Sequence, residues 1–461
     1  MTKFKMMPLV AMISAGLMGC GSSSSDGGSA PTPAPSPTDY VSLQFIQKVG
    51  KQLSVPSGCT VLSKDTSTTP TELTYAKLAS DVRVVAHKAN GAIDNNLKLV
   101  PNESGVLKID KHKLEDGGFV SIIDSPSDSK PFYSVMSIQK QFLENQLIQI
   151  ERNQGNVGCY KDGKELATVS ADVAVFTSNL PNGANGFQYL SSQFDSGIVS
   201  SNIKNVTTNT NEPVLVKSFL TGTLNGYGFA TNLNTNQAQV MLEPLDTTVT
   251  WSDGLTGNSR LDSLKIYVAK NNHVNFWTEP AVSTVQPFDI TSNEQNWHYS
   301  ASGMAENWSL KLNGAFSSAL DIGLPNTLTV SDIAPVVTNA SSKGVIVTSG
   351  VASSGRLLIR AKYTQSSGSG SSLKTLEHVV VGESVSGEII VPDLGFEDLS
   401  AVMPESLKTE LFDIDELSEK QLQNLLRQYE SEDIVAFVIP PSDKELSSYL
   451  SQTASFTSLA R

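Results

Sequence analysis

The first half of the chain contains the stretch Asp81-Val82-Arg83-Val84-Val85-Ala86-His87, which predicts a β-strand. The dipeptide Asn90-Gly91 follows it and is typical of a tight turn between two strands. Two further strands are predicted at Gly105–Ile109 and Gly118–Ile123. Strands this short, separated by turns, indicate a mainly β protein.

Phe132–Ile138 and Gln146–Glu151 alternate apolar and polar residues and predict a fourth and a fifth strand. We therefore expect residues 40–167 to form a β-sandwich-like domain. The order of strand, Asn-Gly turn, Gly-Val-Leu-Lys-Ile and Gly-Gly-Phe-Val-Ser-Ile resembles the carboxypeptidase-regulatory and transthyretin-like sandwiches. That resemblance implies a sandwich fold and no enzymatic activity.

Residues 168–335 continue the same pattern and predict a second β-rich domain. Its turns carry Asn and Gly, as at Asn225-Gly226 and Asn313-Gly314. The predicted strands are Ala171–Phe176, Val214–Leu220, Tyr227–Ala230, Ala238–Leu242, Leu264–Val268, Asn275–Thr278, Asn296–Ser300 and Trp308–Leu312.

Residues 336–461 predict a β domain with helical segments. A helix is expected from Pro404, with Leu407 and Leu411 on one face. Ser418-Glu419-Lys420-Gln421 is a capping box that predicts a second helix, and a third is expected after Ser442. The predicted fold is thus mainly β, with tandem β-sandwich-like domains and a small helical insertion near the C-terminus.

The N-terminus has the organisation of a secretory signal, because Lys3 and Lys5 precede the apolar run from Met6 to Met18. A run this short is below the roughly 20 apolar residues that a membrane-spanning helix needs. It ends in Leu17-Met18-Gly19-Cys20, which resembles the lipobox of bacterial lipoproteins. An ordinary signal peptide followed by a spare cysteine is the alternative.

The lipobox resemblance implies that residues 1–19 are removed and that Cys20 carries a diacylglycerol group and an N-linked acyl chain such as palmitate. Residues 20–39 form a tether, since a Gly/Ser-rich run is followed by Pro31, Pro33, Pro35 and Pro37. Gly21 is not the Asp that resembles an inner-membrane retention signal, so the resemblance implies sorting to the outer membrane. The first expected partner is the lipid bilayer.

The net charge of −13 argues against binding to nucleic acid and to anionic lipid headgroups. Beyond Cys20 the chain has two cysteines, Cys59 and Cys159. In an oxidising envelope compartment they predict one disulfide, and two buried free thiols are the alternative. Two cysteines and scattered histidines do not predict a metal site, and no cofactor is expected.

Sequence motifs of common catalytic sites are missing. The chain has no Gly-x-Ser-x-Gly nucleophile elbow in a strand-to-helix context, no His-x-x-x-His pair and no glycine-rich phosphate loop. A catalytic pair of carboxylates cannot be located from sequence, so a hydrolase acting on polysaccharide stays open.

All four tryptophans, Trp251, Trp277, Trp297 and Trp308, fall in the second region. In Trp297-His298-Tyr299 the two aromatic residues share one face of a predicted strand. Trp297 and Tyr299 are therefore candidate ligand-binding residues if that face is exposed, because sugars stack on aromatic rings. The alternative is an aromatic core.

These observations predict a lipid-anchored outer-membrane lipoprotein, on the cell surface or the periplasmic face, with a structural or adhesive, non-catalytic role. Its expected partners are envelope proteins, a surface appendage or sheath, or external glycan. The alternatives are a glycan-binding lipoprotein and an envelope polysaccharide hydrolase.

Overall fold

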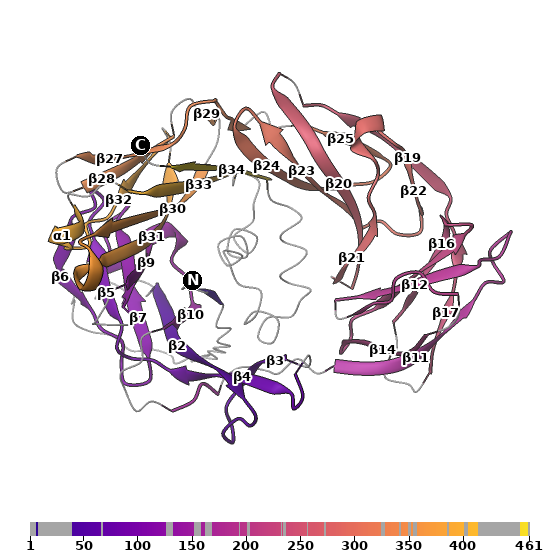
Figure 1. Cartoon of the computed structure of the whole chain (residues 1–461), viewed down its shortest axis with the longest axis horizontal. Coiled ribbons are helices and arrows are strands. Elements are labelled where there is room, and N and C mark those ends of the chain that lie inside the picture. The colour runs from indigo at the N-terminus through magenta and orange to yellow at the C-terminus, as the bar shows by residue number, and fades with distance from the viewer. Residues whose placement is uncertain are drawn as a thin grey trace, which may run out of the picture.

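The computed structural model (Figure 1) describes residues 6–7, 39–65, 68–125, 132–151, 158–161, 168–192, 194–200, 203–231, 233, 237–255, 257–271, 273–323, 328–340, 343–348, 352–353, 357–384, 387–400, 404–413 and 452–459. The described chain is mainly β, as predicted, and its sheets follow one another around an arc (Figure 1). The predicted lipobox cysteine, Cys20, lies outside these residues.

A six-stranded sheet begins the fold, and its centre is the long strand β2. The first part of β2 pairs with β7 and its later part with β4, both antiparallel, and residues 43–47 in its middle also pair in parallel with β10. The strands are β1 (Met6–Met7), β2 (Tyr40–Gln52), β3 (Val61–Asp65), β4 (Glu72–Leu78), β7 (Val106–Asp110) and β10 (Gln146–Ile150).

A 12-stranded sheet connects the beginning, middle and end of the chain. All neighbouring strands in it are antiparallel except β9 and β31, which are parallel. In order, the strands are β21 (His273–Thr278), β20 (Ser259–Lys270), β23 (Trp297–Ala305), β24 (Trp308–Phe316), β34 (Gln452–Leu459), β33 (Ser406–Asp413), β30 (Leu357–Ser367), β31 (Lys374–Ser384), β9 (Phe132–Gln139), β8 (Phe119–Asp124), β5 (Arg83–His87) and β6 (Ile93–Leu99). This pairing crosses the domain boundaries expected after residues 167 and 335, so the three sequence regions do not form three separate sets of sheets.

Smaller sheets complete the sandwich-like layers. Two of them share one apolar core: β14 (Ile203–Asn209), β11 (Thr168–Phe176) and β17 (Gln237–Met241) in one, and β13 (Phe194–Asp195), β12 (Gly186–Ser191), β15 (Val214–Leu220), β16 (Thr223–Ala230) and β18 (Glu243–Pro244) in the other. The others comprise β22 (Phe288–Ile290), β19 (Thr247–Asp253) and β25 (Ala319–Ile322); β27 (Val336–Ala340), β28 (Lys343–Val347) and β32 (Glu388–Val391); and β26 (Leu328–Thr329) with β29 (Ala352–Ser353).

The predicted strands are confirmed wherever the described residues test them. The turns expected at Asn225-Gly226 and Asn313-Gly314 are wrong, because both dipeptides pair within strands, the first in β16 and the second in β24. The stretch around Val84 forms β5, and the turn after it contains Gly91, whose φ of +79° suits a residue without a Cβ atom. The amide N–H of Gly91 donates to the carbonyl oxygen of Lys88 at 2.9 Å and closes this turn.

Helical segments are few in the described part of the chain. They are α1 (Glu397–Ser400) and the 3₁₀ turns η1 (Lys111–Lys113), η2 (Lys140–Phe142), η3 (Val282–Thr284) and η4 (Gly370–Ser372). The helix expected from Pro404 is wrong, because Ser406–Asp413 is strand β33. Leu407 and Leu411 are both buried, and residues four apart share a face in a strand as well as in a helix. The helices expected after Ser418 and Ser442 lie outside the described residues.

Candidate functional site

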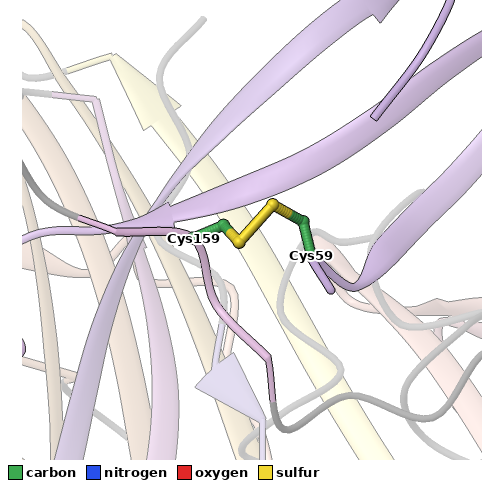
Figure 2. Close-up of a disulfide and its surroundings, with 2 residues drawn as sticks. All are labelled: Cys59 and Cys159. Atoms are coloured by element: carbon green, nitrogen blue, oxygen red, sulfur yellow. A yellow bond between two sulfur atoms is a disulfide. The ribbon is translucent and has the colours of Figure 1, made fainter. Parts of the chain in front are cut away.

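The disulfide predicted between Cys59 and Cys159 is present (Figure 2). Their Cα atoms are 5.3 Å apart, and the bridge joins residues separated by 100 positions. Backbone pairing explains why the two cysteines meet, since Lys77 of β4 bridges to Cys159 and the amide of Thr60 donates to the carbonyl of Tyr160 at 2.9 Å. The bridge fastens the chain after β10 to the edge of the first sheet.

Trp297 and Tyr299, the candidate ligand-binding residues, do not present open ring faces. Their exposed fractions are 1% and 7%, and His298 between them is also buried. The ring of Tyr299 lies over Gly314 of β24, where an added Cβ would come within 2.7 Å of Cε1. Both faces of β23 are covered here, which corrects the binding hypothesis and supports the alternative of an aromatic core.

All four tryptophans are buried, and each indole N–H donates to a backbone carbonyl. The acceptors are Gln286 O for Trp251 (2.9 Å), Asp289 O for Trp277 (2.9 Å), Glu294 O for Trp297 (2.8 Å) and Ser331 O for Trp308 (2.8 Å). A buried indole N–H needs such a partner. Three of these hydrogen bonds have their acceptors in the single stretch 286–294. The tryptophans therefore fix the position of this backbone segment, which is a structural role.

A buried chain of polar side chains crosses the other half of the 12-stranded sheet. Ser121 Oγ and Ser137 Oγ are 2.5 Å apart, Ser137 Oγ is 2.7 Å from His378 Nε2, and Tyr363 Oη is 2.8 Å from His378 Nδ1. The register explains the contacts, because Ser121 is opposite Ser137 and Tyr363 is opposite His378. Sequence reasoning missed this chain, since its serine and histidine are 241 positions apart.

A hydrogen bond between serine and histidine can activate a nucleophile, yet this one is closed to solvent. Ser121, Ser137 and His378 are each 0% exposed. Burial lowers the pKa of His378 to about 3, with a smaller contribution from the nearby His87, and burial raises the pKa of the Tyr363 hydroxyl. The imidazole is therefore neutral at pH 7, and the chain is a polar core network.

Two adjoining cavities lie between this sheet and the segment that follows β32. The inner one has a volume of about 60 Å³ and is lined by Tyr363, Gln365 and Leu376 among others. The outer one measures about 280 Å³, and Phe396 and Leu399 line both. Together the two cavities form a candidate binding site.

The wall of the outer cavity combines residues that are distant in sequence. Tyr133 of β9 and Phe396 pack with ring centroids 4.4 Å apart, and Arg83 of β5 places its guanidinium carbon 5.7 Å from the Phe396 centroid. Lys374 begins β31, beside the start of β9, and Glu397 begins α1. Sequence reasoning missed Tyr133 and Phe396, because nothing in the sequence indicates that β9 pairs with β31.

The described residues contain no group of three or more His, Cys, Asp or Glu placed to hold a metal ion. Within the same part of the chain, no helix is long and apolar enough to cross a membrane.

The sequence matches no protein-family model and no curated protein. The four N-terminal immunoglobulin domains of Dscam1 isoform 9.44, solved with zinc, align at 8% identity and a TM-score of 0.15, over 79% of this chain and 96% of that one. The open conformation of the pilus adhesin SpaC from Lactobacillus rhamnosus GG aligns at 8% identity and a TM-score of 0.13, over 75% of this chain and 55% of that one. TM-scores this low do not show a shared fold, so the fold class rests on the observed strands and sheets.

Proposed function

We propose that this protein is a lipid-anchored outer-membrane lipoprotein whose β body has a structural or adhesive role in the envelope and performs no catalysis. The sealed Ser137–His378 pair carries the non-catalytic part of the proposal. It is the arrangement most similar to a catalytic dyad in the described chain, and neither residue is exposed. Because no substrate can reach the Ser137 hydroxyl, we assign the pair to the packing of the core and not to catalysis.

The anchor is supported by the sequence. Cys20 ends an apolar segment and begins a Gly/Ser and Pro-rich tether that leads to strand β2 at Tyr40. A thiol is the side chain best suited to alkylation near neutral pH. Several acyl chains on one residue meet the requirement that stable anchoring takes more than one chain.

Labelling with radioactive palmitate tests the anchor. Wild-type protein should incorporate label, Cys20→Ser should lose it, and Ser22→Ala, two residues further along, should keep it. Label retained by Cys20→Ser would refute lipidation at this position.

Protease treatment of intact and lysed cells tests where the body acts. Digestion on intact cells would indicate that the body lies on the cell surface. It would then favour a role in adhesion, in a surface sheath or in contact with external glycan. Protection until lysis instead favours partners in the periplasm, such as the cell wall or other envelope proteins.

A panel of glycosidase and esterase substrates tests the absence of catalysis. No turnover above buffer is expected from purified wild-type protein. Turnover that a single Asp or Glu substitution, or Ser137→Ala, abolishes without unfolding the protein would establish an enzyme.

A further inference from the structure

A third cavity opens between β5 and β6, at the end of the 12-stranded sheet. Its volume of about 370 Å³ exceeds the roughly 300 Å³ at which ligand pockets begin. β6 is the terminal strand of this sheet, and both strands lie on the outer side of the arc (Figure 1). The cavity is therefore placed where a molecule from solution can reach it.

An interruption in strand pairing creates this cavity. In the register of the two strands, Val85 is opposite Lys98. Two residues further along β5, His87 is opposite Ile93. The four residues 94–97 of β6 thus lie opposite one residue of β5, which makes them a β-bulge. A bulged strand bends away from its neighbour, and the cavity lies in the resulting gap.

The lining of the cavity is mainly aliphatic. It consists of residues 82–86, 93–95 and 97–100, which include no aromatic ring. Val84 and Leu99 are buried and belong to the core shared with the six-stranded sheet, whereas the side chain of Val100 is 75% exposed. A hydrocarbon surface that borders water favours the burial of another hydrocarbon. Without a ring, the lining offers no stacking surface to a sugar or a base.

The cavity is elongated and has one unengaged charge at its border. Five consecutive residues, 82–86, line it along one strand, a length of about 13 Å. Lys98 is exposed and makes no ion pair within the described chain. The other two charged residues of the lining have partners, since Arg83 donates to a backbone carbonyl and Asp94 accepts from a backbone amide.

We propose that this cavity binds the hydrocarbon chain of a fatty acid and that the carboxylate of the fatty acid pairs with Lys98. An unbranched chain fits an elongated gap between two strands with aliphatic walls. Each methylene group that leaves water favours binding, and the ammonium of Lys98 supplies a charge-assisted hydrogen bond to the carboxylate. The overall charge of −13 acts over a longer range, where salt screens it.

Calorimetric titration of the full-length Cys20→Ser protein tests the proposal. This substitution removes the expected lipid, so the buffer needs no detergent, whose own hydrocarbon would compete. The probes are dodecanoate, octanoate, dodecan-1-ol and acetate. We expect one dodecanoate to bind per chain, octanoate to bind at least tenfold more weakly, and acetate to show no binding. Absence of dodecanoate binding, or equal binding of octanoate and dodecanoate, would overturn the proposal.

A substitution of Lys98 tests the position of the carboxylate. Lys98→Gln should weaken dodecanoate binding at least fivefold and leave dodecan-1-ol binding unchanged, because the alcohol has no charge to pair. Lys108→Gln, at an exposed lysine of β7, is the matched control and should change neither. Equal losses for the acid and the alcohol in Lys98→Gln would refute the pairing.

Substitutions in the lining assign the binding to this cavity. Asn95→Trp, at an exposed lining residue, should fill the gap and weaken both dodecanoate and dodecan-1-ol at least tenfold. Val100→Gln should weaken both severalfold and leaves the buried core intact. Asn182→Trp, at an exposed turn elsewhere, is the control. Near-ultraviolet circular dichroism checks folding, and unchanged binding in folded Asn95→Trp and Val100→Gln would exclude the cavity.

This titration and the palmitate labelling give separate answers. The titration uses purified protein without its lipid, so it does not depend on the anchor or on where the body acts. Palmitate label in wild-type protein without dodecanoate binding would remove the cavity assignment alone. Dodecanoate binding without palmitate label would remove the anchor alone.

Discussion

Trp277 and Trp297 meet edge to face, with ring centroids 4.9 Å apart and ring planes at 81°. Each also fastens the same stretch of backbone, Trp277 through the carbonyl of Asp289 and Trp297 through that of Glu294. Tyr227 of β16 approaches Trp277 at 5.6 Å between centroids. The pair therefore joins the 12-stranded sheet to the sheet that contains β16 and holds down the segment that leads into β23.

The first prediction concerns Trp297. Trp297→Phe keeps most of the buried ring and leaves the Glu294 carbonyl without its donor, which should lower the free energy of unfolding by about 1–3 kcal/mol. Trp297→Ala removes the ring as well and should cost about 3–5 kcal/mol. Urea denaturation measures both. Leu373→Ala, at a side chain 39% exposed, is the control and should stay within about 0.5 kcal/mol.

The sequence predicted the strands well because apolar runs are local signals, whereas Asn-Gly dipeptides were a weaker guide, since two of them lie inside β16 and β24. It could not decide which face of β23 is covered, since an alternating pattern shows that Trp297 and Tyr299 share a face without showing what lies over it. Long-range pairing was also beyond reach. The parallel pair of β9 and β31 creates both the polar chain at His378 and the cavity wall at Tyr133, and no local pattern links these strands.

A spacing of four residues misled the prediction at Leu407 and Leu411. It fits one face of a helix and, equally, one face of a strand. Hydrogen bonding of β33 to β30 on one side and β34 on the other favours the strand. This pairing forms only in the folded chain, so the local sequence does not reveal it. The disulfide was predictable for a different reason: after Cys20 is assigned to lipid, two cysteines are left to form one pair.

The second prediction concerns the disulfide. Replacing both cysteines, Cys59→Ser with Cys159→Ser, should lower the free energy of unfolding by about 4–5 kcal/mol, because the bridge closes a loop of about 100 residues in the unfolded chain. The double variant avoids a free thiol. Denaturant titration with and without dithiothreitol measures the effect. Dithiothreitol should destabilise wild-type protein and leave the double variant unchanged, and a wild-type protein indifferent to reduction would contradict the prediction.

The third prediction concerns pH. Burial lowers the pKa of His378 to about 3 and that of His87 to about 4, from an ordinary value of 6.5. The unfolded chain therefore takes up protons below pH 6.5 that the folded chain refuses, so their stabilising effect is complete above pH 6.5 and is lost as pH falls. The free energy of unfolding should decrease by about 1.4 kcal/mol per pH unit for each histidine.

Denaturation between pH 7 and pH 5 tests this slope. His378→Gln should remove one histidine's share of the slope, while His87, His273 and His298, whose pKa values burial also lowers, keep theirs. The same substitution at the exposed His112 is the control. An unchanged slope in His378→Gln would show that the acid sensitivity arises elsewhere.

The fourth prediction concerns the buried ion pair of β30 and β33. Arg360 Nε lies 2.7 Å from Glu410 Oε2, and Lys408 Nζ lies 3.2 Å from Glu410 Oε1. Arg360→Met leaves the carboxylate buried without its main partner and should cost about 3–5 kcal/mol, whereas Arg360→Met with Glu410→Met should recover most of the loss. A double-mutant cycle by urea denaturation measures the coupling. Arg260→Met, in a largely exposed pair with Asp262, should change stability by at most about 1 kcal/mol.

The last prediction concerns the C-terminal strand. β34 lies between β24 and β33 and is the strand through which the two halves of the 12-stranded sheet are joined. Ending the chain at residue 451 would expose two strand edges in the middle of the sheet and remove Ala454, which is fully buried. Exposed edges pair with other chains, so the truncated protein should aggregate and become sensitive to protease between β24 and β30.

Size-exclusion chromatography and limited proteolysis compare this truncation with removal of residues 460–461 alone, which leaves β34 intact. The shorter deletion should behave as wild type, because it leaves all of β34 in place. If the long truncation also stays monomeric and protease-resistant, the two halves of the sheet are stable without β34, and the cores on either side of it fold independently. Aggregation of the long truncation alone would instead make the C-terminal strand the element that joins the first half of the fold to the second.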